Sequence, residues 1–300
     1  MLLNDFVREG VVALEALYPE REARNIVLIL CEDMAGVRSY THIVDPRYEL
    51  SDSQADVLSA ALERLVKGEP VQYVTGKADF YGLRFNVNRN VLIPRPETEL
   101  LCREAVKEAS RIQRRRIPYG KKAEPVSMLD LCTGSGCIAW TVALNVPGCL
   151  VTGVDISSGA LSVAVNQDFS ARLKESGAVR PEFVEADVLV ENQDFDWKPF
   201  DMVLSNPPYI MESEKALMRV NVLDYEPASA LFVPDDDPLL FYRAVAGWSR
   251  RYMLPEGVGM TEVNESLAQQ TAEVFRTAGY GHTVIVKDFN DRNRFVVYRK

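Results

Sequence analysis

From Val126 onward, short apolar runs typical of β-strands alternate with segments of helical periodicity. Strands that alternate with helices predict an α/β fold built on a mostly parallel, doubly wound sheet. The first four runs finish in polar residues, namely Asp130, Asp155, Asp187 and Asn206. Because ligands bind beyond the carboxyl ends of the strands in such sheets, we expect these four residues to surround one crevice. The predicted strands cover residues 126–131, 149–155, 182–187, 200–205, 257–264, 282–288 and 294–299.

The first ~70 residues have a different pattern, in which apolar residues recur with a period of about 3.6. One apolar stripe runs from Leu3 to Leu17, and a second helix is predicted over residues 21–36. A third runs from the N-cap candidates Ser51 and Asp52 to Gly68. We therefore predict a helical bundle over residues 1–72 and a linker with a β-hairpin near residues 88–90 over residues 73–96. An α/β domain follows over residues 97–300, and its first helix opens at Pro96.

Composition excludes several classes of protein. No apolar run approaches the roughly 20 residues that cross a membrane, and the N-terminus lacks the pattern of a signal peptide. The five cysteines have no CxxC spacing and there are two histidines, so we expect no metal site and no disulfide framework, and a reduced cytoplasm fits best. The net charge of −9 disfavours a protein that coats nucleic acid. The basic stretch from Arg103 to Lys122 is interpreted as a solvated helix end that runs into a loop.

The segment DLCTGSGCIA places Gly134 and Gly136 between a predicted strand and a predicted helix. Small residues there let a ligand approach the backbone, and the helix N-terminus offers free amide donors. Asp155 follows Gly136 by 19 residues and ends the next strand, where a carboxylate can accept hydrogen bonds from both ribose hydroxyls of an adenosine. This pattern indicates a nucleoside cofactor but does not separate NAD from S-adenosylmethionine. The alternative is a tight turn without a ligand.

The third predicted strand ends in Asp187, and Val188 follows it. The Asp187 side chain or the Val188 backbone is a candidate for contact with an adenine edge. The alternative is a helix cap or a turn, because an aspartate at a strand end commonly serves as one.

The fourth predicted strand ends in Ser205-Asn206-Pro207-Pro208-Tyr209. Proline lacks an N–H and pushes the preceding residue into an extended conformation. The Asn206 side-chain oxygen and the Pro207 carbonyl can therefore accept hydrogen bonds from one planar NH₂ group, and Tyr209 can supply an aromatic face. Two such acceptors can aim the nitrogen lone pair of an amide, normally delocalised into its carbonyl, at a methyl donor. An enzyme that transfers hydride has no evident use for this arrangement. The alternative interpretation of the Asn-Pro-Pro-Tyr sequence is a rigid loop without a catalytic role.

These motifs together resemble the HemK/PrmC family, the peptide-chain release factor glutamine N5-methyltransferases. Residues 69–101 are similar to the family's linker and the entry to its catalytic domain, and DLCTGSGCIA is similar to its cofactor loop. VDISSGALSVAVNQ looks like its ribose-binding segment and FDMVLSNPPYI like its catalytic loop, and EPASALF follows as in the family. The resemblance implies a class I, Rossmann-like methyltransferase domain preceded by a helical bundle. Because the first ~70 residues form apolar stripes but carry no recognisable chemistry, we expect this bundle to recognise the protein substrate.

The resemblance also implies the reaction and its site. A methyl group would pass from S-adenosylmethionine, leaving S-adenosylhomocysteine, to the side-chain amide nitrogen of the glutamine in a Gly-Gly-Gln motif of release factors. The implied catalytic residues are Asn206, Pro207, Pro208 and Tyr209. The implied cofactor-binding residues are Cys132, Thr133, Gly134, Ser135, Gly136, Asp155, Asp187, Val188 and Asn206. We expect the protein to be a monomer and to bind neither a membrane nor a nucleic acid.

Two departures from the family pattern are apparent. Cys132 stands where the family often has glycine, and VPDDDPLLFY replaces a more glycine-rich segment. Two other methyltransferase functions share the Asn-Pro-Pro-Tyr sequence: methylation of a ribosomal-protein glutamine and methylation of adenine N6 in DNA. The DNA enzyme would need a basic recognition region and a flipped base, which the acidic composition disfavours. A non-enzymatic adaptor that uses the helical bundle is the remaining alternative.

Overall fold

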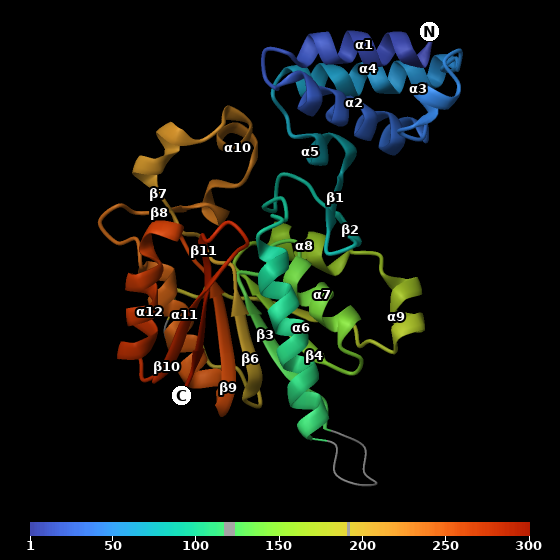
Figure 1. Ribbon diagram of the computed structural model, residues 1–300. Coiled ribbons are helices and arrows are strands. Elements are labelled where there is room, and N and C mark those ends of the chain that lie inside the picture. The colour runs from blue at the N-terminus through green and yellow to red at the C-terminus, as the bar shows by residue number, and fades with distance from the viewer. Residues whose placement is uncertain (117–123, 191–192) are drawn as a thin grey trace. The chain divides into compact units, whose positions relative to one another are not determined.

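The computed structural model describes residues 1–116, 124–190 and 193–300, which form two compact units. Unit 1 comprises Met1–Lys77 and Met218–Tyr225, and unit 2 comprises Ala78–Leu217 and Glu226–Lys300. The regular secondary structure of unit 1 is helical, apart from Lys77, which begins strand β1, and an isolated bridge between Leu2 and Glu49 (Figure 1). Its helices are α1 Leu3–Leu14, α2 Glu20–Ala35, α3 Thr41–Val44, α4 Asp52–Val66, α5 Val71–Thr75 and α10 Val220–Tyr225.

Helices α1, α2 and α4 are the three predicted from the sequence. The Ser51 hydroxyl accepts from the Gln54 N–H at 3.2 Å and the Gln54 side chain accepts from the Ser51 N–H at 3.0 Å, a reciprocal cap that fixes the start of α4. Gly36 ends α2 in the left-handed region, at φ 67°. The apolar stripe of α1 is buried from Leu3 to Leu14, but Leu17 lies beyond the end of the helix and is exposed. The short helices α3 and α5 were not predicted.

Residues Met218–Tyr225 belong to unit 1 although they lie far along the chain. The Arg219 guanidinium pairs with Glu22 at 3.1 Å, and the Tyr225 hydroxyl donates to the Lys67 carbonyl at 2.8 Å. Nothing in the local sequence indicated this association, because it depends on partners more than 150 residues away.

Unit 2 is built on a seven-stranded sheet in the order β10-β11-β9-β6-β3-β4-β5. The last five strands in this order are parallel, β11 runs antiparallel to β9, and β10 runs antiparallel to β11. The predicted mostly parallel sheet is confirmed, and each predicted strand corresponds to one of the seven. The strands are β3 Ser127–Leu131, β4 Leu150–Asp155, β5 Glu182–Glu185, β6 Phe200–Ser205, β9 Met253–Glu262, β10 His282–Lys287 and β11 Asn293–Arg299.

Helices cover both faces of this sheet (Figure 1). Side chains alternate across each strand, so Met128 and Met202 pack in the core under α6 and α7, whereas Leu129 and Val203 pack in the core under α11 and α12. The helices of unit 2 are α6 Thr98–Arg115, α7 Cys137–Asn145, α8 Ser158–Val165, α9 Ser170–Ser176, α11 Leu240–Tyr252 and α12 Ala268–Thr277. Shorter elements are the 3₁₀ turns η1 Glu212–Leu217, η2 Ala228–Ala230 and η3 Glu265–Leu267, and the paired strands β7 Ile210–Met211 and β8 Phe232–Val233.

Two local predictions were wrong. Residues 157–177 form not one helix but α8 and α9, because the buried Gln167 side chain bonds to the Asn86 backbone in both directions, at 2.8 and 2.9 Å. The β-hairpin consists of β1 Lys77–Phe80 and β2 Leu83–Asn86 and turns at Tyr81 and Gly82 rather than near residues 88–90. Asn88 instead accepts from the Asn90 N–H at 2.9 Å within a turn.

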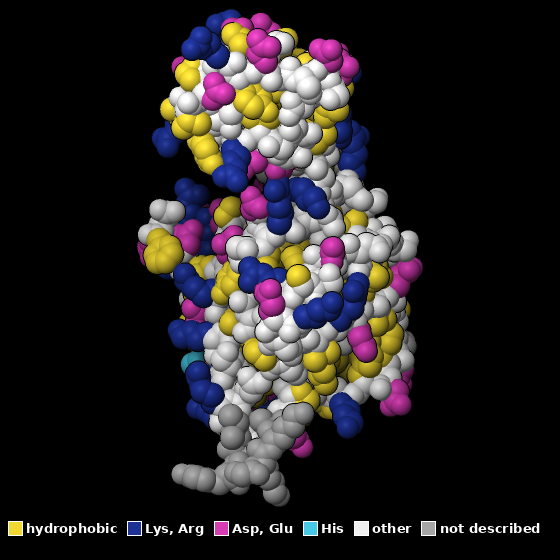
Figure 2. Space-filling model, turned by 90° about the vertical axis from the view of Figure 1, so that its right-hand side faces the viewer, with side chains coloured by type: hydrophobic (Ala, Val, Ile, Leu, Met, Phe, Trp, Pro, Cys, Tyr) yellow, Lys and Arg dark blue, Asp and Glu magenta, His cyan; other side chains and the backbone are white. Residues whose placement is uncertain are grey.

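The basic stretch after Arg103 is helical as far as Arg115, and its part from residue 117 to 122 lies outside the described residues. Among its described cations, Arg111 pairs with Glu108, and Arg116 pairs with the buried Asp201. On the face of unit 2 seen in Figure 2, Lys and Arg side chains are interspersed with Asp and Glu side chains. Among the described residues, no helix has the length and apolar character that crossing a membrane requires.

Candidate active site

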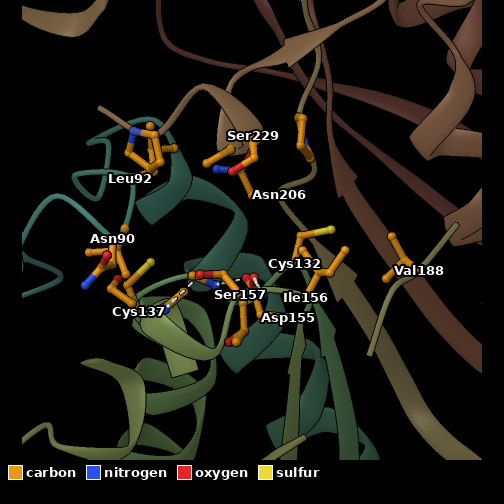
Figure 3. A pocket seen from close by; sticks show the side chains of 18 of the residues that line it. Asn90, Leu92, Cys132, Cys137, Asp155, Ile156, Ser157, Val188, Asn206 and Ser229 are labelled. Atoms are coloured by element: carbon orange, nitrogen blue, oxygen red, sulfur yellow. Dashed lines mark hydrogen bonds between the residues drawn. The ribbon is translucent and has the colours of Figure 1, made fainter. Parts of the chain in front are cut away.

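A cavity of about 300 Å³ opens at the carboxyl ends of β3, β4 and β6 (Figure 3). Its volume lies at the lower end of the roughly 300–1,000 Å³ typical of ligand sites. Of the four polar residues expected to converge, Asp155, Asp187 and Asn206 line the cavity. Asp130 was expected there as well, but it is completely buried within β3, because the strand turns its side chain into the interior, where it accepts from the Thr133 hydroxyl at 2.6 Å.

The Gly134–Gly136 turn connects β3 to α7 and forms one wall of the cavity. Gly136 occupies the N-cap position of α7 at φ 75°, and a Cβ there would approach the Trp140, Ala164 and Phe183 side chains within 3.0–3.1 Å. Gly134 is also left-handed, at φ 55°, but a Cβ there would meet nothing within 4 Å. Gly136 is therefore required by packing and backbone geometry, whereas Gly134 leaves open space beside the backbone, as the approach of a ligand requires.

Cys132 begins this turn in the left-handed region, at φ 60°. That region disfavours side chains, so the backbone geometry explains why glycine is common here in the family that the motifs resemble. Cys132, Thr133 and Ser135 line the cavity together with Gly134, so four residues of the predicted loop contact it.

Asp155 ends β4 and organises the turn. Its Oδ2 accepts from the Gly134 N–H at 2.8 Å and its Oδ1 accepts from the Ser157 N–H at 2.9 Å. Burial raises the pKa of Asp155, and these backbone bonds partly offset the effect. Each carboxylate oxygen has a second lone pair, so Asp155 can tie down the backbone and accept from a ligand hydroxyl as well. The neighbouring Ile156 lines the same cavity with an exposed side chain, which suits a flat apolar group such as a purine.

Asp187 and Val188 follow β5 at the far side of the cavity. The Asp187 carboxylate accepts from the Leu189 N–H at 2.9 Å, and the Val188 carbonyl accepts from the Trp248 indole at 2.9 Å. Asp187 is thus a turn former, as one of the two sequence interpretations held, and it also borders the cavity.

The Asn206–Tyr209 loop follows β6 at the opposite wall from Asp155. Asn206 and Pro208 line the cavity, and the Asn206 Nδ2 donates to the Thr98 hydroxyl at 3.3 Å. The Pro207 side chain is buried. The Tyr209 hydroxyl donates to the buried Glu262 carboxylate at 3.1 Å. Burial and the Glu262 carboxylate raise the pKa of Tyr209, so its phenol stays protonated and acts as the donor.

Sequence reasoning assigned no role to several residues that border the cavity. Arg95 lines it and pairs with the buried Glu226 at 2.6 Å, and Glu226 also accepts from the Ile93 N–H at 3.2 Å. Leu92 and Asn90 line it from the same segment. The available signal is the segment LIPRPET itself, which the sequence resemblance assigns to the linker and the entry to the catalytic domain. Within the described residues, no group of three or more His, Cys, Asp or Glu side chains is placed to hold a metal ion.

Comparison with known proteins agrees with this geometry. Residues 5–76 match the family model of the PrmC N-terminal domain, and residues 100–224 match that of the methyltransferase small domain. The hMettl16 catalytic domain, solved in complex with MAT2A 3'UTR hairpin 6, superposes with a TM-score of 0.52 at 12% identity over 83% of this chain and 82% of that one. That likeness shows the fold alone.

Two curated relatives cover nearly the whole chain. The release factor glutamine methyltransferase of Flavobacterium psychrophilum is 34% identical over 99% of this chain and 98% of its own length. The enzyme of the same name from Bacteroides thetaiotaomicron is 34% identical over 98% of both chains. On this similarity, the chain belongs to the release factor glutamine methyltransferase family.

Proposed function

We propose that the protein methylates the side-chain amide nitrogen of the Gly-Gly-Gln glutamine in release factors, with S-adenosylmethionine as the methyl donor. The observation that carries this proposal is the cavity in which Asp155 and the Gly134 turn face Asn206 and Pro208. The relatives' shared name supports a release factor as the substrate. A release factor substrate also places the protein in the cytoplasm, and we expect it to act as a monomer.

The residues present fit this cofactor. Asp155 would accept from its ribose hydroxyls, Ile156 and the Asp187–Val188 turn would flank its adenine, and the open side of Gly134 would admit its amino-acid part. When bound, S-adenosylmethionine supplies an electrophilic methyl group. The protein's own contribution is to bring an amide nitrogen to that group and hold it there.

Asn206 is proposed to perform this positioning. Its Nδ2 is held by Thr98, so its Oδ1 is left to accept one N–H of the target amide, and the Pro207 carbonyl would accept the other. With both N–H bonds held, the nitrogen would become pyramidal, and its lone pair, less delocalised into the carbonyl, would point at the methyl group. Methylation would make the nitrogen cationic and acidic, so that one N–H proton would leave to solvent, and the bond broken would be the S–CH₃ bond of the donor, which would leave as S-adenosylhomocysteine. Orientation of this kind contributes at most roughly 7–11 kcal/mol.

The test uses purified protein, a release factor and S-adenosylmethionine labelled in the methyl group. Peptide mapping should place the label on the glutamine of the Gly-Gly-Gln motif. Asn206→Ala should lower kcat by about 10²–10³ because it removes one preorganised acceptor, while cofactor affinity changes much less. Label on another residue would contradict the proposed substrate, and near-normal turnover of Asn206→Ala would contradict the proposed site.

The helices of unit 1 are proposed to recognise the release factor. They carry a separate core and, apart from Met218–Tyr225, precede the segments that line the cavity. Hydrogen exchange of the full chain should show protection within residues 1–77 when the release factor is added. Protection confined to residues 78–300 would contradict this role.

A further inference from the structure

Three side chains from three different elements form a hydrogen-bonded chain that ends at Asn206. Glu262 is the last residue of β9, Thr98 is the first residue of α6, and Asn206 follows β6. The Thr98 hydroxyl donates to Glu262 Oε2 at 2.7 Å and accepts from Asn206 Nδ2 at 3.3 Å. Glu262 Oε1 accepts from the Tyr209 hydroxyl at 3.1 Å, so the same carboxylate supports both ends of the Asn206–Tyr209 loop.

The donor and acceptor of each hydrogen bond in this series follow from the Glu262 carboxylate at one end. A carboxylate only accepts, and a hydroxyl has one proton to donate. Because the Thr98 proton is directed at Glu262, the hydroxyl offers only lone pairs to Asn206. An amide oxygen on that side would be repelled, so the NH₂ of Asn206 must face Thr98 and its oxygen must face away. Thr98 is 1% exposed and Glu262 is 4% exposed, so water cannot readily replace either partner.

We propose that Glu262 is a positioning residue that acts through Thr98 to hold the acceptor oxygen of Asn206 toward the substrate amide. This inference rests on the proposed function, because it assigns Glu262 and Thr98 to the orientation of the residue that would hold the glutamine. Neither residue needs to touch the glutamine for this role.

The ionisation of Glu262 then controls the orientation of Asn206. A protonated Glu262 can donate to Thr98, which frees the Thr98 proton for the Asn206 oxygen and favours the reversed amide. Burial raises the pKa of Glu262, and the Thr98 and Tyr209 hydroxyls act against the rise. The charged and titratable groups that interact with Glu262 are Glu97 and Cys102 near the start of α6, Cys137 of α7, Tyr209, Tyr242 of α11 and Arg294 of β11. The active orientation should therefore be lost as pH falls through the raised pKa.

The first experiment compares Thr98→Val with Thr98→Ser in the full-length protein. Thr98→Val removes the hydroxyl and keeps the shape, so kcat should fall at least about tenfold while the Kd for S-adenosylmethionine stays within about twofold. Thr98→Ser keeps the hydroxyl and should restore most of the turnover. Thr141→Val is the matched control, because Thr141 is equally buried on α7 and its hydroxyl has no hydrogen-bond partner among the described residues. It should leave kcat unchanged.

A double variant separates positioning from general support. In an Asn206→Ala background, Thr98→Val should lower kcat no further, since Thr98 acts only through Asn206. Additive losses would overturn the inference and indicate a structural role. If Asn206→Ala itself retains turnover, the proposed function of the loop fails. If Asn206→Ala is impaired and Thr98→Val is not, only the present inference fails.

Glu262→Gln tests the ionisation. A glutamine can accept from Thr98 and donate to the Tyr209 hydroxyl, so it preserves the arrangement without a proton to gain. In the wild type, kcat should fall as the pH is lowered, and this fall (the acidic limb of the profile of kcat against pH) should disappear in Glu262→Gln. At high pH, kcat of Glu262→Gln should stay within a few-fold of the wild type. A wild-type profile without an acidic limb, or a Glu262→Gln profile that keeps it unchanged, would overturn the role of the carboxylate.

Discussion

Replacement of Asp155 by alanine should affect both the stability of the fold and the proposed cofactor site. The carboxylate accepts two backbone N–H groups, from Gly134 at 2.8 Å and from Ser157 at 2.9 Å. Hydrogen bonds to a charged group contribute about 1.5–3 kcal/mol each. Burial disfavours the Asp155 charge, as its raised pKa shows, so part of that gain is already offset in the wild type. We expect Asp155→Ala to lower the free energy of unfolding by about 1–3 kcal/mol.

Asp155→Ala should also weaken the binding of S-adenosylmethionine, by more than the loss of folding stability alone would explain. Loss of the proposed ribose contact corresponds to about 1.5–3 kcal/mol, or roughly 10- to 150-fold in Kd. Urea unfolding of the apoprotein measures the first quantity, and titration calorimetry at a temperature where the variant is folded measures the second.

Asp288→Ala provides a matched control for this experiment. The Asp288 carboxylate also accepts from two backbone N–H groups, those of Asn290 and Arg292, but it does not line the cavity. Its removal should leave cofactor affinity unchanged. An Asp155→Ala protein with wild-type cofactor affinity would refute the reasoning, as would an equal loss of affinity in the Asp288→Ala protein.

Two further predictions concern the same turn. Burial raises the pKa of Asp130 from 3.8 to about 7, so the folded state holds a proton that the unfolded state releases, and stability should decline as pH rises from about 4 to about 7. Asp130→Asn should flatten this decline, whose upper limit is about 4 kcal/mol, in urea unfolding curves recorded across that range. Cys132→Gly should change the free energy of unfolding by less than about 1 kcal/mol, because relief of the left-handed backbone offsets the entropy of glycine. Cys132→Val should cost about 1–3 kcal/mol more, and equal stabilities of the two variants would contradict this account.

Local sequence determined the strands and the two chemical loops. Each strand of the sheet contains at least two consecutive apolar residues and is bounded by polar or turn residues, so the pattern of apolar residues identifies it without knowledge of its neighbours. The Gly134–Gly136 turn and the Asn206–Tyr209 loop could be recognised because backbone conformation there depends on glycine and proline themselves. Their position at the carboxyl ends of parallel strands then followed from the rule for doubly wound sheets.

Tertiary structure decided everything that joins residues distant in the chain. The break between α8 and α9 follows the Gln167–Asn86 bonds, and the inclusion of Met218–Tyr225 in unit 1 follows its contacts with Glu22 and Lys67. Thr98 and Asn206 are 108 residues apart, and Thr98 and Glu262 are 164 apart. No propensity or spacing encodes such pairs, because their energy arises only when the folded sheet brings β6, β9 and the start of α6 together and excludes water from the bonds between them.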